Sequence, residues 1–429
     1  ESHPKALIID DIRQKGLRGK QRLGVDLIVS SANATLVDNI IHPWPTASYD
    51  IYGSPPLDQD VAMIIYTSGS TGYPKGVMLT NYNVLSSIRS TAYYLKNNSA
   101  DRVLCLLPLS FNYGLGQLLC MVMVGGTTVL HHIPMASEIV NAFQYYEITG
   151  FAAVPPIWVD LTAYLQEEPV SFPKLKYITN AGGKCPTPTL KKLPLCFPDA
   201  KIYLMYGMTE TVRSTFLDPL FFNHKIGSLG KAVPGAEIFV VDDNSHICKP
   251  KQVGEIVHRG SSVCLGYLKR DEETHKKLKP AYTIQGIAGN DLVCFSGDLG
   301  YQDEEGYFWF VGRKDMMIKV KGFRVSPDEI RDIFMHVQGV HDAIAFGLLN
   351  DDDIEEIHAV VVPEEKNSVQ VDSLRGYCRS HMPGYMMPSH IHIWEKELPK
   401  TVNGKIDIQS IKASINNLFK NKETLSYVN

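Results

Sequence analysis

The stretch Tyr66-Thr-Ser-Gly-Ser-Thr-Gly-Tyr-Pro-Lys-Gly76 is a loop rich in hydroxyl groups and glycines that directly follows a short apolar run. Glycine permits close approach of a ligand to the backbone, and hydroxyl groups and a lysine offer hydrogen bonds and positive charge. The residues that supply these properties are Thr67, Ser68, Gly69, Ser70, Thr71, Gly72 and Lys75. The β- and γ-phosphates of a nucleotide require such groups, so the loop predicts a polyphosphate site. Taken alone, the loop is also compatible with a plain flexible turn.

The loop differs from the phosphate loop of kinases and GTPases. Its lysine, Lys75, follows Pro74 and precedes Gly76, so the pattern GxxxxGK[ST] is absent. A net charge of -4 over 429 residues gives the chain no general attraction to nucleic acid or to anionic membranes. Phosphate binding must therefore be local, and we expect no nucleic-acid partner.

The elements on either side of the loop predict an α/β fold. Short β-branched runs alternate with amphipathic stretches, which is typical of layered α/β sheets. These runs cover residues 61–66, 102–107, 127–130, 150–154, 177–179 and 201–205. From Gly230 onward, shorter strand-like runs with glycine turns at 237–241, 254–258 and 307–311 indicate a β-rich subdomain.

The last quarter of the chain predicts a separate small α+β unit. Helix-like stretches cover 327–337 and 372–381, and strand-like runs cover 342–346 and 357–362. A chain of 429 residues is also too long for a single ordinary core. We therefore expect an amino-terminal domain over 1–312 and a carboxy-terminal domain over 313–429.

Composition and cysteine usage indicate a cytoplasmic protein. Hydrophobic residues make up 44% and charged residues 21%, as in folded soluble proteins. The 8 cysteines form no CxxC pair and no zinc spacing, which favours reduced thiols. The longest apolar run, 118–124, is too short to cross a bilayer, and no signal peptide precedes it.

Together with four later motifs, the loop resembles the phosphate-binding signature of the adenylate-forming superfamily, the AMP-dependent synthetases and ligases. This superfamily comprises acyl-CoA synthetases, adenylation domains of peptide synthetases and luciferases. The segment Tyr206-Gly-Met-Thr-Glu210 resembles its aromatic-Gly-x-Thr-Glu motif. The resemblance implies that the Tyr206 ring stacks on adenine beside Gly207, that Thr209 contacts phosphate and that Glu210 helps to bind Mg²⁺. Ser296-Gly-Asp298 resembles the ribose motif, in which the aspartate accepts both ribose hydroxyls, although an isolated SGD is commonly a turn.

Two further motifs resemble the hinge and the catalytic loop of the mobile lid. In the segment from Gly312 to Val325, the resemblance implies that Arg313 touches ribose, Asp315 is the hinge and Gly322 borders the pantetheine channel. The alternative for this basic segment is a solvated face. In Leu398-Pro-Lys-Thr-Val-Asn-Gly-Lys405, the resemblance makes Lys405 the catalytic lysine, whereas a lone NGK is usually a turn with an exposed lysine.

The resemblance spans residues 66–405 and implies a two-step reaction. ATP and Mg²⁺ activate a carboxylic acid as an acyl-adenylate, and the acyl group then passes to the thiol of CoA or of a carrier protein's phosphopantetheine. One departure is the region upstream of the loop, which at 65 residues is shorter than the family normally has, so we expect the first part of the large domain to be missing.

The acid pocket is expected around Phe111-Asn-Tyr-Gly-Leu-Gly116, which occupies the place of the family's acid-pocket motif. Amino-acid-activating members carry an aspartate where this chain has Asn112. A substrate ammonium would lose a charge-assisted hydrogen bond worth roughly 1.5–3 kcal/mol. An acyl, hydroxy or aryl acid is therefore favoured, and a turn-forming asparagine is the alternative.

Other pocket positions follow from the same resemblance. The expected lining residues are Asn112, Tyr113, Gly116, Met205, Arg213 and Ser214, with Gly182 beside the nucleotide. Arg213 could engage a second polar or anionic group of the substrate, and surface exposure is its alternative. The stretch from Val154 to Trp158 either completes the wall or belongs to the core.

Three functions remain open on the sequence alone. The leading interpretation is an acyl-CoA synthetase. The second is a stand-alone amino-acid or aryl-acid adenylation enzyme that loads a separate carrier protein. The third is a nucleotide-binding pseudoenzyme or inactive fragment, against which the retention of Lys405 and Glu210 argues. The sequence leaves the identity of the acid and the oligomeric state open.

Overall fold

The computed structural model of the chain describes residues 6–9, 27–30, 56–67, 74–320, 323–350, 354–366, 368–401 and 404–416. The chain divides into two compact units, Glu1–Leu57 and Asp58–Asn429. In the first unit, β1 (Ala6–Ile9) pairs in parallel with β2 (Leu27–Ser30).

The centre of the second unit is a seven-stranded sheet with the order β11-β10-β9-β8-β7-β5-β6. Its five parallel strands are β5 (Arg102–Cys105), β6 (Thr127–Leu130), β7 (Gly150–Ala153), β8 (Tyr177–Asn180) and β9 (Lys201–Tyr206). Two short antiparallel strands, β10 (Thr215–Leu217) and β11 (Lys231–Ala232), complete one edge. The alternating pattern predicted each of the parallel strands to within two residues.

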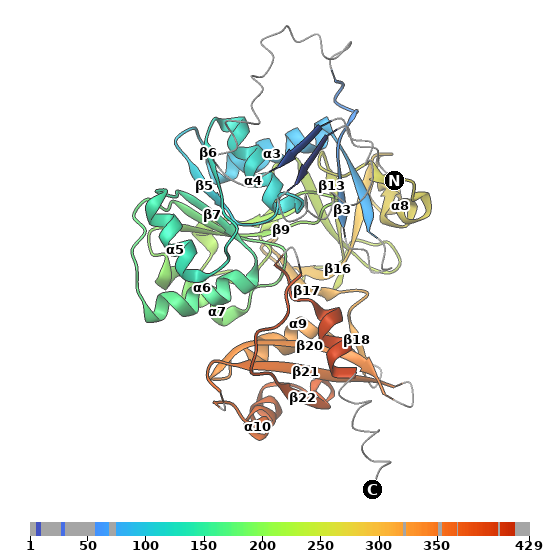
Figure 1. Cartoon of the computed structure of the whole chain (residues 1–429). Coiled ribbons are helices and arrows are strands. Elements are labelled where there is room, and N and C mark those ends of the chain that lie inside the picture. Colours follow the sequence, from blue (N-terminus) through green and yellow to red (C-terminus); the bar gives the residue numbers. More distant parts are fainter. Residues whose placement is uncertain are drawn as a thin grey trace. The chain divides into compact units, whose positions relative to one another are not determined.

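Helices connect the successive parallel strands, and the strand order reverses once within the sheet. These helices are α4 (Asn112–Val124), α5 (Ala136–Tyr145), α6 (Pro155–Glu167) and α7 (Thr187–Cys196) (Figure 1). The chain moves outward from β5 to β6 and then returns past β5 to β7, so the strand order reverses between β5 and β7. Ligands of open α/β sheets bind outside the carboxyl ends of strands at such a reversal.

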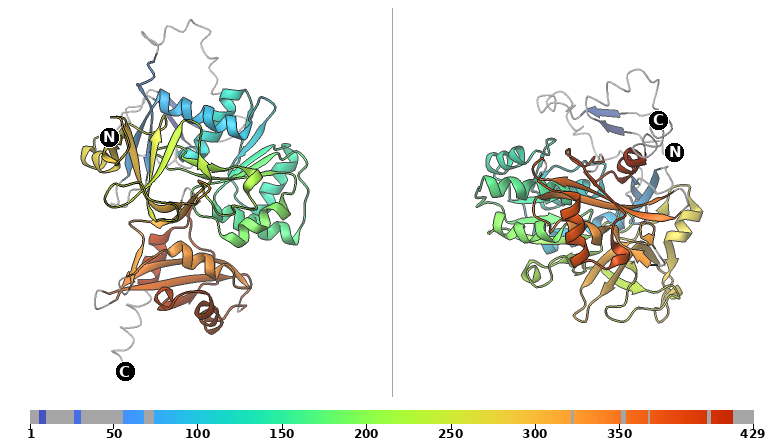
Figure 2. Two further views of the ribbon diagram at one scale, coloured as in Figure 1. Left: turned by 180° about the vertical axis from the view of Figure 1, so that it is seen from behind. Right: turned by 90° about the horizontal axis from the view of Figure 1, so that it is seen from below.

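Antiparallel sheets flank the central one. One sheet contains β12 (Ala236–Val241), β13 (Gly254–Gly260), β15 (Leu278–Pro280), β16 (Leu292–Gln302) and β17 (Phe308–Arg313). Another contains β3 (Val61–Thr67), β4 (Lys75–Thr80) and β14 (Gly266–Tyr267). In the chain, α3 (Asn81–Leu95) follows β4, and α8 (Asp271–Lys277) follows β14. Figure 2, viewed from behind, shows the yellow strands of the five-stranded sheet beside the central sheet. The predicted β-rich region after Gly230 is therefore present.

The carboxy-terminal residues have a hydrophobic core of their own. Its elements are β18 (Ile318–Val320), β19 (Phe323–Val325), α9 (Pro327–Phe334), β20 (Val340–Leu349), β21 (Glu355–Pro363), α10 (Val371–His381) and β22 (His390–Ile393). Two buried clusters, both made only of residues between Ile318 and Ile415, line the two faces of the β20-β21-β22 sheet. The helix predicted at 327–337 ends earlier, at Phe334. Short 3₁₀ turns occur at Pro219–Phe221, Ala281–Thr283 and Gly384–Met386.

Within the residues that the structure describes, no helix is both long and apolar enough to cross a membrane. All eight cysteines are unpaired, and six of them are buried.

Candidate active site

A cleft of about 1010 Å³ opens at the carboxyl ends of the central parallel strands. The segments that follow β5, β8 and β9 all line it, because the carboxyl ends of parallel strands meet at the same edge. Among the residues predicted from the motifs, those at the cleft are Thr67, Lys75, Asn112, Tyr113, Gly182, Met205, Tyr206, Gly207, Thr209, Glu210, Arg213, Asp298, Arg313 and Lys405. Motifs that lie more than 300 residues apart in the sequence therefore share one cavity.

The predicted phosphate loop starts and ends at this cleft. Thr67 and Lys75 pair across the β3–β4 hairpin, and the Lys75 ammonium lies 5.5 Å from the centre of the Tyr267 ring. The Tyr267 hydroxyl donates a 2.5 Å hydrogen bond to Oε1 of Glu210. This bond fixes the carboxylate beside the hairpin and leaves its Oε2 atom without a hydrogen bond from any described residue. The predicted residues Ser68, Gly69, Ser70, Thr71 and Gly72 lie outside the described ranges.

Glu210 could hold a magnesium ion. Mg²⁺ prefers carboxylate and phosphate oxygens, and Glu210 offers one such oxygen next to the β3–β4 hairpin. The residues present therefore fit an ion that is bound partly by the protein and partly by substrate phosphates.

A second group of polar residues surrounds Asp298. The Tyr206 hydroxyl donates a 2.6 Å hydrogen bond to Oδ2 of Asp298, and Nε of Arg313 lies 3.1 Å from Oδ1. The Arg313 contact does not have hydrogen-bond geometry, so the buried Oδ1 atom still lacks a donor. Burial raises the pKa of Asp298, whereas the positive charge of Arg313 lowers it. An oriented carboxylate with a free acceptor is suited to receive a hydroxyl group of a ligand.

Lys405 reaches the same cleft from a tight hairpin near the carboxyl terminus. The Thr401 amide donates to the Lys405 carbonyl at 2.6 Å, and Gly404 has a φ of +74°, which suits glycine. The ammonium lies 5.5 Å from the centre of the Phe111 ring. Although the side chain is accessible from the open cleft, desolvation by the surrounding protein and the charge of Arg313 lower the pKa of Lys405.

Two glycines of the cleft wall let neighbouring residues pack closely against the backbone. An added Cβ at Gly182, where φ is +83°, would lie 3.5 Å from Cε of Lys405. At Gly207 the added atom would lie 2.9 Å from backbone atoms of Val212 and Arg213, so no side chain fits. Both positions therefore require glycine for close packing of the cleft wall.

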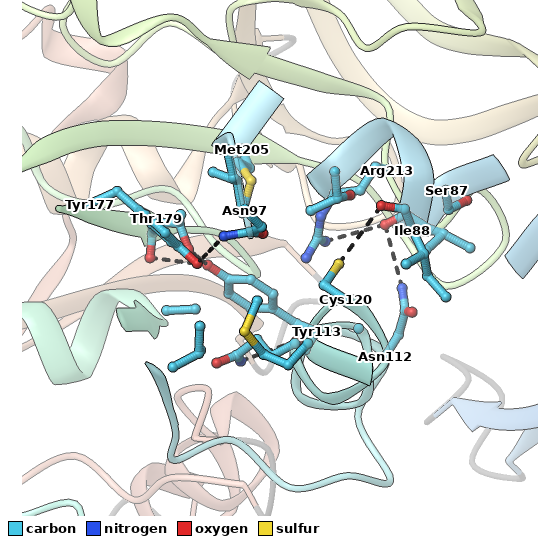
Figure 3. A pocket seen from close by; sticks show the side chains of 18 residues that line it. Ser87, Ile88, Asn97, Asn112, Tyr113, Cys120, Tyr177, Thr179, Met205 and Arg213 are labelled. Carbon is cyan, nitrogen blue, oxygen red and sulfur yellow. Dashed lines mark hydrogen bonds between the residues drawn. The ribbon is translucent and has the colours of Figure 1, made fainter. Parts of the chain in front are cut away.

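A narrow inner pocket continues from the cleft between α3, α4 and the central sheet (Figure 3). It leaves about 40 Å³ of free space, and its lining is mostly apolar. Asn112, Tyr113, Met205 and Arg213 belong to both cavities, and Gly116 belongs to the inner one. A Cβ at Gly116 would meet no atom within 4 Å, so this glycine leaves the pocket open.

The structure places the remaining predicted residues elsewhere. Ser214 lines neither cavity, because its buried hydroxyl lies 3.0 Å from Nδ1 of His258 and bonds with Thr211. Val154 and Trp158 belong to the hydrophobic core, which was the alternative interpretation. Asp315 pairs with Arg313 at 3.2 Å but does not line the cleft. Gly322 lies outside the described residues.

Some lining residues gave no signal in the sequence. Tyr267 lies 57 residues from Glu210, and only the tertiary fold brings them together. Ser87 and Thr91 from α3 and Gln117 from α4 line the inner pocket. The one sequence feature that could have indicated these three residues is the presence of polar side chains on the buried face of a helix.

The comparisons with known proteins agree with this geometry. Residues 1–268 match the AMP-binding enzyme family, and residues 329–405 match the AMP-binding enzyme C-terminal domain. The chain therefore belongs to the AMP-binding enzymes, which confirms the resemblance to the adenylate-forming superfamily. The α/β architecture predicted with it is also confirmed.

Among its relatives, the chain is 29% identical to an oxalate–CoA ligase of Arabidopsis thaliana over 392 residues, which are 89% of this chain and 71% of the relative. It is 32% identical to a 2-succinylbenzoate–CoA ligase of Bacillus pumilus, over 82% of this chain and 68% of that protein. A solved O-succinylbenzoate CoA synthetase from Bacillus subtilis, in complex with ATP and magnesium ion, matches with a TM-score of 0.74 and 27% identity. That match covers 94% of this chain and 78% of the other.

Proposed function

We propose that this chain is an AMP-forming acid–thiol ligase that converts a carboxylic acid to its CoA thioester through an acyl-adenylate. The observation that carries the proposal is the meeting of Lys405, Glu210, Asp298 and the β3–β4 hairpin around one cleft. Lys405 suits the reacting carboxylate and the α-phosphate, and Glu210 suits magnesium. Asp298 suits the ribose hydroxyls, and the β3–β4 hairpin suits the terminal phosphates. The names of the CoA ligase relatives support the same reaction.

In the first step, a carboxylate oxygen of the substrate attacks the α-phosphorus of ATP, and the bond to the bridging oxygen breaks as pyrophosphate leaves. The Lys405 ammonium bridges the carboxylate and the α-phosphate, while Lys75 and the hairpin hold the leaving group. Mg²⁺ at Glu210 would offset negative charge on the phosphate oxygens. Catalysis is then mainly positioning and charge stabilisation, and no protein nucleophile is needed.

In the second step, the thiol attacks the acyl carbonyl carbon and AMP leaves. We propose that the carboxy-terminal domain, residues 313–429, rotates about Asp315, which withdraws Lys405 and presents the Gly322 segment to the thiol. One cleft then serves both half-reactions.

The acid is proposed to lack an α-ammonium group. Asn112, a neutral side chain, lies at the entrance to the inner pocket, where its amide donates to the Val212 carbonyl at 3.4 Å. No carboxylate lines the inner pocket among the described residues, so an ammonium group would have no counter-charge there. An acyl, hydroxy or aryl acid fits this lining better than an amino acid.

Thioester formation with free CoA tests the proposal. The enzyme is incubated with ATP, Mg²⁺ and a panel of acids, and acyl-CoA and AMP are separated chromatographically. Equal yields of acyl-CoA and AMP are expected. AMP and free acyl-adenylate without acyl-CoA, together with acylation of a phosphopantetheinyl carrier protein, would instead support the carrier-loading alternative.

A further inference from the structure

Arg213 is an isolated positive charge in the inner pocket. It is the only charged residue among the 18 that line the pocket, and its side chain is mostly buried, with 8% of the residue exposed. Its guanidinium lies 4.6 Å from the centre of the Tyr113 ring (Figure 3), and its Nη1 atom donates to the Val212 carbonyl at 3.2 Å. The Nε atom is buried without a hydrogen-bond acceptor among the described residues.

This arrangement lacks the partner that a buried arginine normally requires. Moving a cation out of water costs several kcal/mol unless an anion and hydrogen bonds compensate, and no described carboxylate lies within ion-pair distance of Arg213. A guanidinium binds a carboxylate through two parallel hydrogen bonds. The missing partner is therefore expected to be a ligand.

The backbone holds Arg213 toward the pocket. Val212 has a φ of +54°, an unfavourable conformation for a β-branched residue, and the Arg213 amide bonds back to the Thr211 carbonyl. Asn112 also donates to the Val212 carbonyl, so two side chains fasten this turn. Such strain is retained where the surrounding structure fixes a special geometry.

We propose that the acid activated by this enzyme carries a second carboxylate, and that Arg213 binds it while Lys405 faces the carboxylate that reacts. The proposal rests on the function proposed above. Arg213 lines both cavities, so the tail of one acid can extend from the nucleotide cleft to the guanidinium. The small free volume favours a short or flat diacid over a long fatty chain.

The test compares each diacid with its monomethyl ester, using succinate, glutarate, adipate and terephthalate in acid-dependent pyrophosphate exchange. The wild-type enzyme should prefer at least one diacid by about 10-fold to 100-fold in kcat/KM, as for a charge-assisted hydrogen bond worth roughly 1.5–3 kcal/mol. Arg213→Met should abolish this preference, and Arg213→Lys should keep part of it. The control variant Arg259→Met alters an arginine outside both cavities and should leave the preference for the diacid unchanged. Equal or better use of the esters by the wild-type enzyme would overturn the proposal.

Direct binding separates failure of this subsite from failure of the proposed function. The same diacids are titrated calorimetrically into the wild-type and Arg213→Met proteins without ATP. Binding that requires Arg213, in an enzyme that catalyses no exchange, would overturn the ligase reaction and retain the anion subsite. Absence of both binding and exchange with every diacid would overturn the subsite.

A separate cluster of side chains on the β20-β21-β22 sheet forms a candidate metal site. Glu356 and His358 alternate along β21, and His390 lies opposite His358 on the parallel strand β22. One ligand atom from each of these three residues lies within 4.8 Å of the other two, and Nε2 of His392 lies 3.2 Å from Nδ1 of His358. None of the four residues lines the nucleotide cleft.

We infer that this cluster, Glu356 with His358, His390 and His392, binds a zinc-like divalent ion. Imidazole nitrogens and carboxylate oxygens are zinc ligands, and the 4.8 Å limit on the separation of the Glu356, His358 and His390 ligand atoms places all three around one point.

Calorimetric titration of tag-free protein with Zn²⁺ tests this site. One ion per chain is expected, with binding weakened more than about 10-fold in His390→Ala and in Glu356→Gln but not in His246→Ala, an exposed histidine elsewhere. Absence of saturable binding, or equal affinity in all variants, would overturn the inference. His390 and Glu356 are partly exposed, so these variants are expected to fold.

Discussion

Replacing Lys405 by alanine should separate the two half-reactions. The lysine reaches the cleft on a hairpin, with its Cε close to Gly182 and its ammonium over the Phe111 ring. Alanine would remove the charge while the hairpin, which is closed by the Thr401 backbone, is retained. The change should therefore act on charge stabilisation rather than on folding.

The expected magnitude follows from the loss of one preorganised donor. Removal of such a donor from a desolvated site costs about 10²-fold to 10³-fold in rate. Acid-dependent exchange of labelled pyrophosphate measures the first half-reaction, and synthetic acyl-adenylate with CoA measures the second. Exchange should fall by that factor, whereas thioester formation from the adenylate should stay within about twofold to threefold of wild type, a difference below 1 kcal/mol.

A lysine on the same domain provides the control. Lys396 lies beside Trp394 and lines neither cavity, so Lys396→Ala should preserve both rates. Equal losses in both half-reactions of Lys405→Ala would refute the assignment, because they would indicate a general defect of binding or folding.

Three further changes follow from the same geometry. Asp298→Asn should raise the KM for ATP by about 10-fold to 100-fold, with a smaller change in kcat, because charge-assisted hydrogen bonds to ribose are lost. Steady-state kinetics that show only a loss of kcat would contradict this prediction. Desolvation and the charge of Arg313 lower the pKa of Lys405, so the rate of pyrophosphate exchange should decline at a pH below the ordinary pKa of lysine. Lys405→Arg should move this decline to higher pH. Identical pH–rate profiles for the wild-type and variant enzymes would argue against a role for the charge of Lys405. Burial lowers the pKa of His258 to about 3, so between its ordinary value and about pH 3 the unfolded chain binds a proton that the folded chain does not. Stability should therefore fall as the pH drops through that window, and His258→Gln should flatten the slope in thermal unfolding; an unchanged slope would contradict this.

Much of the architecture could be predicted from local patterns. The parallel strands are short β-branched runs whose pattern is visible without knowledge of their neighbours, and their observed bounds differ by at most two residues. The meeting of Lys405 with the cleft was expected only from the family resemblance. No local property of the NGK turn distinguishes it from an exposed one.

The acid pocket shows the limit of assigning positions by resemblance. The resemblance placed both Arg213 and Ser214 in the pocket, but Val212 between them and Thr211 has a positive φ, and the Ser214 hydroxyl lies against His258 instead. Burial of Arg213 also depends on α3 and α4, which are distant in sequence. Such long-range packing has no signature in a single sequence, and for the same reason the contact between Glu210 and Tyr267 could not be predicted.

Whether this cleft forms acyl-adenylates can be measured by exchange of labelled pyrophosphate into ATP, with the wild-type chain and a panel of fatty, aryl, dicarboxylic and amino acids. Exchange should require both Mg²⁺ and an added acid, be strongest with a diacid and be weak with amino acids. Absence of exchange with every acid, from protein that is folded and binds ATP, would contradict the claim that this cleft forms acyl-adenylates.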